Sequence, residues 1–205
     1  MTTSARIATG LIITSMFLLA ACASSPVHYY TLVPPATREE SARPTAPFVI
    51  DVVPVGIPAQ LDQQQMVVRS GAEGVTILDA QRWAAPLGDE LRTALSSDLV
   101  RQLNTQDVAG LSRPVNRQVL VVRVQIRRFD AWPGVDAGMD ADWSVRPVQS
   151  TGSAGVTCHT QLHAEASGRY AGIVRVQQRI VDELAGQIAR TASDAGTTGQ
   201  YRCPD

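Results

Sequence analysis

The sequence contains no lysine, and all 18 of its basic residues are arginines. This absence excludes a P-loop lysine, a Schiff-base lysine and a lysine general base. An excess of one charge is also missing, because 19 acidic residues leave a formal net charge of −1. Without bulk basicity, nucleic acid is not an expected partner. The hydrophobic share of 44% and the charged share of 18% are those of a globular chain.

The longest apolar run is short and ends at the first of three cysteines. Arg6 supplies a positive charge, residues 7–21 are mostly apolar, and Cys22 follows. A transmembrane helix needs about 20 predominantly apolar residues, so this run fits a secretory signal peptide better. Residues 19–21, Leu-Ala-Ala, resemble the bacterial lipobox. The alternatives are an ordinary secreted protein with an incidental cysteine, or a buried apolar helix.

The lipobox resemblance implies that Cys22 carries lipid. In such signals the leader is cut between Ala21 and Cys22, the thiol receives a diacylglycerol, and the new amine is acylated. Each buried methylene contributes roughly 0.8 kcal/mol, and several chains together make an anchor stable. By the same resemblance, Ala23 in place of an aspartate favours the outer over the inner membrane. We therefore expect a lipid-anchored protein that faces the periplasm.

Two cysteines remain once Cys22 is assigned to the anchor, namely Cys158 and Cys203. In an oxidising compartment an even pair is usually a disulfide. The bridge would close a loop of about 45 residues and contribute about 3–4 kcal/mol in the chain-entropy model. We predict this bond, with two free thiols as the alternative.

The remaining sequence predicts three regions and one fold class. Residues 1–21 form the signal peptide, residues 22–47 form the acylated cysteine and a proline-rich tether with a short strand at 28–32, and residues 48–205 form a single domain. The fold class is α/β, as a two-layer α+β arrangement with a mixed or antiparallel sheet packed against two amphipathic helices.

Hydrophobic periodicity places the elements of this domain. A helix is expected at 86–104, where Pro86 suits the first turn and Asn104 suits the end, and a second helix at 171–191. The expected strands are the first part of 48–61, a hairpin over 64–70 and 74–80, a long half-exposed strand at 118–132, and antiparallel neighbours at 142–148 and 156–166.

Two polar groups raise the question of a metal site. Asp136, Asp140 and Asp142 suggest a calcium loop, but the closing glutamate of an EF-hand is missing, so a polar loop is predicted. His159 and His163 share a strand face with Glu165, yet four residues separate them by about 13 Å along a strand. We expect a solvated sheet face and no metal.

Five segments occur in the order found in one known family. They are the lipobox followed by HYYTL, then VGIPAQLDQQQMVVR, RWAAPLGDELRTALSSDLVRQL, VVRVQIRRFDAWPG and a closing LAGQIA. Together they resemble the PqiC/YmbA-like lipoproteins, the auxiliary lipoprotein components of ABC-type transport systems. The resemblance implies an outer-membrane partner of an inner-membrane MCE-domain protein, within a system that moves lipid across the periplasm and supports envelope integrity.

The functional expectation is therefore a non-enzymatic lipoprotein without catalytic residues, and without any cofactor beyond the diacylglycerol and N-acyl chain on Cys22. One alternative is a structural envelope-assembly lipoprotein with no role in lipid transport. A less favoured one is a membrane-anchored hydrolase, although GSAG at 152–155 lacks the Gly-x-Ser-x-Gly pattern of a nucleophile elbow. An uncovered sheet edge or face would leave room for a homo-oligomer.

Overall fold

The computed structural model describes residues 26–35, 44–148 and 155–204, and these form two sheets and two α-helices. The larger sheet has the order β2-β5-β6-β7, with β2 Phe48–Val52, β5 Gln118–Trp132, β6 Asp136–Pro147 and β7 Val156–Glu165. The smaller has the order β1-β4-β3, with β1 His28–Tyr30, β3 Gln65–Arg69 and β4 Val75–Trp83. The helices are α2 Leu87–Leu103 and α3 Tyr170–Thr198, and a short 3₁₀ turn, η2, spans Ala59–Leu61. Within the described residues, no helix has the length and apolarity needed to cross a membrane.

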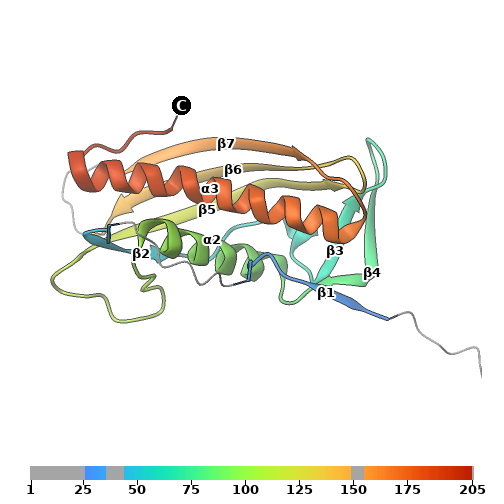
Figure 1. Ribbon diagram of the computed structural model, residues 1–205, viewed down its shortest axis with the longest axis horizontal. Coiled ribbons are helices and arrows are strands. Elements are labelled where there is room, and N and C mark those ends of the chain that lie inside the picture. Colours follow the sequence, from blue (N-terminus) through green and yellow to red (C-terminus); the bar gives the residue numbers. More distant parts are fainter. Residues whose placement is uncertain (1–25, 36–43, 149–154, 205) are drawn as a thin grey trace, which may run out of the picture.

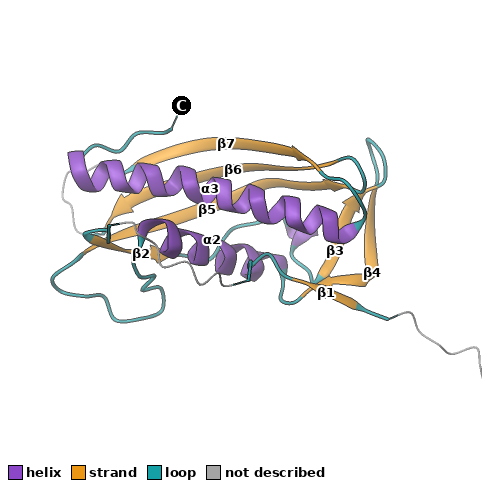
Figure 2. Ribbon diagram, in the orientation of Figure 1, coloured by secondary structure: helices purple, strands orange, loops and turns teal. Residues whose placement is uncertain are grey.

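The layers confirm the predicted fold class. Both helices lie on the same side of the four-stranded sheet (Figure 1), and Figure 2 shows the two helices as one layer against the strands. The large sheet is mixed, because β2 pairs in parallel with β5 while β5, β6 and β7 are antiparallel. The strands divide into two sheets where the sequence indicated one. The pairing of β3 with β4 has a register shift between Gln65 and Met66.

Helix α2 is one residue shorter at each end than the predicted 86–104. Pro86 occupies its N-cap, and Asn104 at its C-cap adopts the left-handed conformation, with φ of 45°, which asparagine tolerates better than most residues. Its leucines recur on one face and are completely buried, as in Leu91, Leu95 and Leu99. The end signals and the apolar stripe therefore agree, and they place each end of the helix to within one residue.

Helix α3 is longer than predicted. The expected helix at 171–191 continues to Thr198, and Gly199 at the C-cap has φ of 72°, a value that suits glycine. The extension is rich in small residues, and two of them, Ala192 and Ala195, are buried. Small side chains gave little periodic signal, although they continue the same buried stripe.

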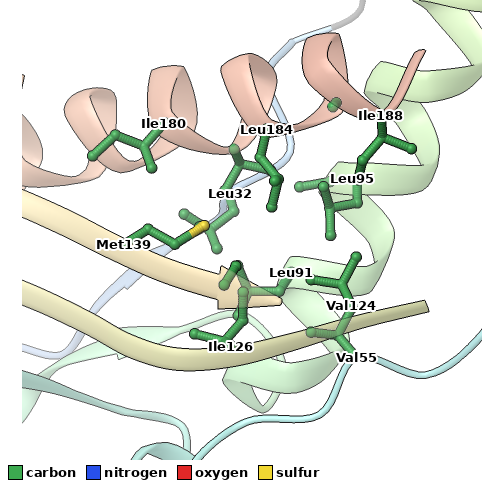
Figure 3. Close-up of a cluster of buried hydrophobic side chains, with 14 of the residues drawn as sticks. Leu32, Val55, Leu91, Leu95, Val124, Ile126, Met139, Ile180, Leu184 and Ile188 are labelled. Atoms are coloured by element: carbon green, nitrogen blue, oxygen red, sulfur yellow. The ribbon is translucent and has the colours of Figure 1, made fainter. Parts of the chain in front are cut away.

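The main core lies between the two helices and the inner side of the large sheet. Figure 3 shows its centre, where side chains of α2 and α3 meet those of β5 and β6. Leu32, which follows β1 in the segment predicted to be a tether, is also buried there. Its backbone N–H and the Thr31 hydroxyl both donate to Glu90 Oε2 of α2, at 2.8 and 2.7 Å. The segment just after β1 is therefore held on the first turn of α2.

Strand β6 begins six residues earlier than predicted, and the expected polar loop at Asp136, Asp140 and Asp142 is wrong. These residues lie on β6 and pair with β5 and β7. They alternate with buried residues such as Ala137 and Met139, which is the period of a half-buried strand. Aspartate and glycine are disfavoured in strands, and the segment is a strand because β5 and β7 pair with it on both sides.

A buried carboxylate at the contact between the helices gives a pH prediction. Asp98 of α2 is buried and accepts a hydrogen bond from Arg101, which also pairs with Asp182 of α3. Burial raises the pKa of Asp98 and outweighs the Arg101 hydrogen bond, which lowers it. The folded state thus binds a proton at Asp98 more tightly than the unfolded chain, so the contribution of this group to stability rises as the pH falls.

We expect the stability of the parent protein relative to Asp98→Asn to increase as the pH falls from neutrality toward the ordinary aspartate pKa of 3.8. The comparison with Asp98→Asn removes the pH dependence shared with all other groups. The measurement is the free energy of unfolding by denaturant at a series of pH values. A difference that is constant or that falls with pH would contradict the assignment.

Candidate interaction face

The side of the large sheet that faces away from the helices is the candidate functional site, and we call it the outer face. Strands β5, β6 and β7 each place alternate polar side chains there, opposite the buried residues of the core. Its charged and histidine residues are Arg123, Arg127, Arg128, Asp130, Asp136, Asp140, Asp142, Arg146, His159, His163 and Glu165. Strand β5 turns its arginines to this face, while aliphatic residues such as Val124 and Ile126 lie on the buried side.

At the centre of the outer face an aspartate joins three strands. Arg127 Nε donates to Asp142 Oδ2 at 2.8 Å, and His159 Nδ1 lies 2.9 Å from Asp142 Oδ1. His159 Nε2 lies 3.6 Å from an oxygen of Asp140. Hydrogen bonds from His159 and then from Arg127 lower the pKa of Asp142. This cross-strand network keeps Asp142 ionised and pairs opposite charges at the surface.

A second charged group ties the small sheet to the large one. Arg69 Nε of β3 donates to Asp130 Oδ1 at 2.9 Å, and Arg128 NH2 donates to Asp130 Oδ2 at 2.6 Å. The bulge in β5 between Ile126 and Arg128 brings consecutive arginines onto the outer face. Asp130 is thereby held between two arginines, and the β3–β4 hairpin is fixed against the end of β5.

The histidines do not converge on one point. His163 Nε2 lies 3.5 Å from Asp136 Oδ2, whereas His159 pairs with Asp142 and Asp140. Among residues 26–35, 44–148 and 155–204, no three His, Cys, Asp or Glu side chains are placed to hold a metal ion. The outer face therefore offers paired charges and hydrogen-bonding groups, which suit it to a hydrated contact with another surface.

The loop between α2 and β5 covers one corner of this side of the sheet. Val108 of the loop packs with Val49 of β2 and Val119 of β5 in a small separate cluster. A pocket of about 440 Å³ lies beside it and is lined in part by Arg113 and Arg117. Arg113 donates to Asp51, and Arg117 donates to the carbonyl oxygens of Ala46 and Phe48. Both arginines thus hold the loop against β2 and the residues just before it.

Cys158 and Cys203 form a disulfide, with 5.6 Å between their Cα atoms. The bond joins β7 to the tail that follows α3, and the Thr191 hydroxyl also donates to the carbonyl oxygen of Arg202. The tail is therefore fastened to the sheet and to the last turns of α3. Cys22 and Ala21 lie outside the described residues, as do residues 152–154 of the GSAG segment.

Sequence reasoning missed the network around Asp142. The available signal was the alternation Asp136, Gly138, Asp140, Asp142 between apolar neighbours, which predicts that the aspartates share one strand face. The partners, however, come from β5 and β7. Only the strand register, including the bulge in β5, brings Arg127 and His159 to the same carboxylate.

Two solved structures have the same α+β fold. One is a crystal structure of an uncharacterized protein, with 20% identity, a TM-score of 0.64, and coverage of 82% of this chain and 100% of the other. The second is from Xanthomonas campestris and belongs to a family known as DUF330, with 14% identity, a TM-score of 0.59, and coverage of 85% and 96%. At these identities the similarity establishes the fold alone. The curated proteins provide no match to the sequence.

The two-layer α+β fold therefore recurs in other proteins. Within it, the sequence profile of the ABC-type transport auxiliary lipoprotein component matches residues 30–189, which is well over half of the chain. The chain belongs to this family. The resemblance found in the sequence segments is confirmed, and with it the description of the chain as a transport-auxiliary lipoprotein component.

Proposed function

We propose that the protein is a non-enzymatic lipoprotein, anchored in the outer membrane through acylated Cys22, that serves an MCE/ABC-type system moving lipid across the periplasm. Its partner is an inner-membrane MCE-domain protein. The observation that carries the proposal is the family match over residues 30–189, because it assigns the folded domain to a transport system. The lipobox before Cys22 supports the anchor, and Ala23 supports the outer membrane.

The fold supports a domain that stays close to its anchor. Strand β1 begins at His28, so only the five residues 23–27 lie between it and Cys22. A fully extended chain advances at most about 3.5 Å per residue, which gives a reach of roughly 20 Å. Directly after β1, Thr31 and Leu32 are fastened to Glu90. The domain therefore begins near the bilayer and extends from it.

The outer face is the surface that we assign to the partner. Its charges are paired laterally within this chain, as in the Arg127–Asp142–His159 network. Paired charges at a partly hydrated surface favour specificity and orientation over high affinity. This suits a component that must meet a partner anchored in the opposite membrane. Self-association of the chain remains a prediction.

Co-purification tests this proposal. The full-length chain, extracted from membranes in detergent, is expected to carry acyl mass on an N-terminal Cys22 by intact mass spectrometry and to bring an MCE-domain protein with it. Cys22→Ser should lose the acyl mass and most of that partner, because the protein no longer remains at the membrane surface. Bound phospholipid, detected by mass spectrometry, would favour transport over scaffolding.

Two results would contradict it in different ways. A mature chain that begins elsewhere, or that lacks acyl mass, would remove the anchor. An acylated chain that never retains an MCE-domain protein would leave the structural envelope-assembly alternative.

A further inference from the structure

The exposed apolar side chains of the described residues gather mainly at one end of the molecule. Seven large hydrophobic side chains are exposed, and five of them lie at or next to β1, in β4, or in the β5–β6 turn. We call these five the end patch: Val27, Tyr29, Val75, Ile77 and Val135. The other two, Leu111 and Val115, lie in the loop between α2 and β5. Figure 1 shows β1, β3 and β4 at one end of the long axis, and that loop at the other.

The β3–β4 hairpin has a core side and an outward side. Met66 and Val68 of β3 are buried against the main core. The β3 residues that alternate with Met66 and Val68 pair with Ile77 and Val75 of β4. Val75 is 55% exposed and Ile77 is 51% exposed. The hairpin therefore closes the end of the core with one face and presents aliphatic side chains with the other, where nothing in the described chain covers them.

The tether identifies what covers this end. This step rests on the proposed function, because it requires the acyl chains to be on Cys22. With a reach of roughly 20 Å from Cys22 to His28, the end that carries β1 stays within that distance of the lipid surface. The loop with Leu111 and Val115 lies at the far end of the long axis. Of the two exposed apolar regions, only the end patch is thus held beside the bilayer.

We propose that the end patch rests on the phospholipid surface of the membrane that holds Cys22, so that the domain stands with its long axis away from that membrane. Tyr29, which is 62% exposed, has the amphipathic ring that favours the interface between lipid headgroups and water. Val75, Ile77 and Val135 supply aliphatic contact. The charges beside the end patch are of both signs, with Glu73 in the hairpin turn and Arg69 opposite Val75, where it is paired with Asp130.

The contact positions the rest of the structure. With β1 and the β3–β4 hairpin at the lipid, strands β5, β6 and β7 run from the membrane toward the periplasm (Figure 1). The outer face then lies parallel to the bilayer normal, and the loop with Arg113 and Arg117 is the part farthest from the lipid. A short tether alone would limit the distance, whereas the end patch also fixes the orientation.

Quenching by brominated lipid tests the proposal in the full-length acylated protein. Ile77→Trp and Val115→Trp each place one added indole at an exposed aliphatic position, at opposite ends of the molecule. Both are reconstituted in phosphatidylethanolamine-rich vesicles with and without bromine on the acyl chains, and the emission of the parent protein is subtracted. We expect the emission added by Ile77→Trp to be largely lost in brominated vesicles, and that added by Val115→Trp to be unchanged.

The remaining outcomes separate this inference from the function on which it rests. If intact mass shows acylated Cys22 and neither indole is quenched, the membrane contact is wrong while the anchor stands. Equal quenching of both would mean that the domain lies flat, and would overturn the upright orientation. A concentration-dependent blue shift of the Ile77→Trp emission in detergent would mean that a second copy covers the patch, which also overturns the proposal. Absent acyl mass would remove the anchor and this inference together.

Discussion

Replacing Trp143 with alanine is expected to lower the free energy of unfolding by about 3–5 kcal/mol. Trp143 of β6 is only 1% exposed and is the largest fully buried side chain. Its Nε1–H donates to Thr160 Oγ1 of β7 at 2.9 Å, and Thr160 in turn donates to Gln187 Oε1 of α3 at 2.6 Å. The substitution would open a cavity and leave Thr160 without its donor. Urea unfolding followed by circular dichroism measures the loss.

Two further variants separate packing from hydrogen bonding at this position. Trp143→Phe keeps most of the apolar volume and removes the N–H, so we expect it to lose clearly less than alanine. Thr160→Val removes the acceptor and leaves the indole N–H unpaired, at a cost of about 1–3 kcal/mol. A loss below about 1 kcal/mol for Trp143→Ala would show that the site is not part of the core, since buried aromatic truncations cost several times more.

The elements that were predicted well are those in which periodicity and end signals coincide. Helix α2 combines a leucine stripe with Pro86 and Asn104, and β5 alternates between exposed and buried residues over 123–127, after four consecutive buried aliphatic residues at 119–122. The β3–β4 hairpin was recognised from two β-branched segments on either side of glycine-containing residues 70–74. In each of these cases the information is local, because neighbours in the sequence determine both the element and its buried face.

Strand β6 shows where local information fails. Its first half contains Asp136, Gly138 and Asp140, and its buried positions there include Ala137, so the hydrophobic signal is weak. The segment forms a strand because β5 and β7 pair with it on both sides. Tertiary context overrides strand propensity here. The division into two sheets was likewise not predicted, and the contact between them through Arg69 and Asp130 joins residues far apart in the sequence.

The sequence predicted which side chains of the candidate site lie on the outer face, but not which of them contact one another. The outward positions of Arg123, Arg127, His159 and His163 follow from alternation, and the structure places them outward. Their pairing with aspartates of β6 required the register of three strands. The hydrogen bond from the Leu32 backbone N–H to Glu90 was also not predicted, because 58 residues separate the two partners in the sequence. Sequence patterns thus identified surfaces, whereas the contacts across them depend on the completed fold.

Removing the Cys158–Cys203 disulfide is expected to lower stability by about 4 kcal/mol, on the chain-entropy estimate for a loop of this length. The sequence separation is 45 residues, and the loop contains the whole of α3. In the folded protein α3 is held independently by its buried stripe, so the bond acts mainly by restricting the unfolded chain. Cys203→Ser leaves Cys158 as a buried thiol, which a core accepts as a small apolar group.

Two measurements distinguish restriction of the unfolded chain by the disulfide from a local effect of the C-terminal tail in the folded protein. An unfolded chain that is freed of its cross-link exposes more surface, so the denaturant dependence of the unfolding free energy should be steeper for Cys203→Ser than for the oxidised parent. Reductant should lower the stability of the parent to that of the variant and leave the variant unchanged. Thr191→Val is the matched control, because it removes only the hydrogen bond to Arg202 and should cost about 1 kcal/mol with an unchanged slope. If the reduced parent unfolds at the same denaturant concentration as the oxidised one, the bond contributes nothing, and the tail is held by its other contacts alone.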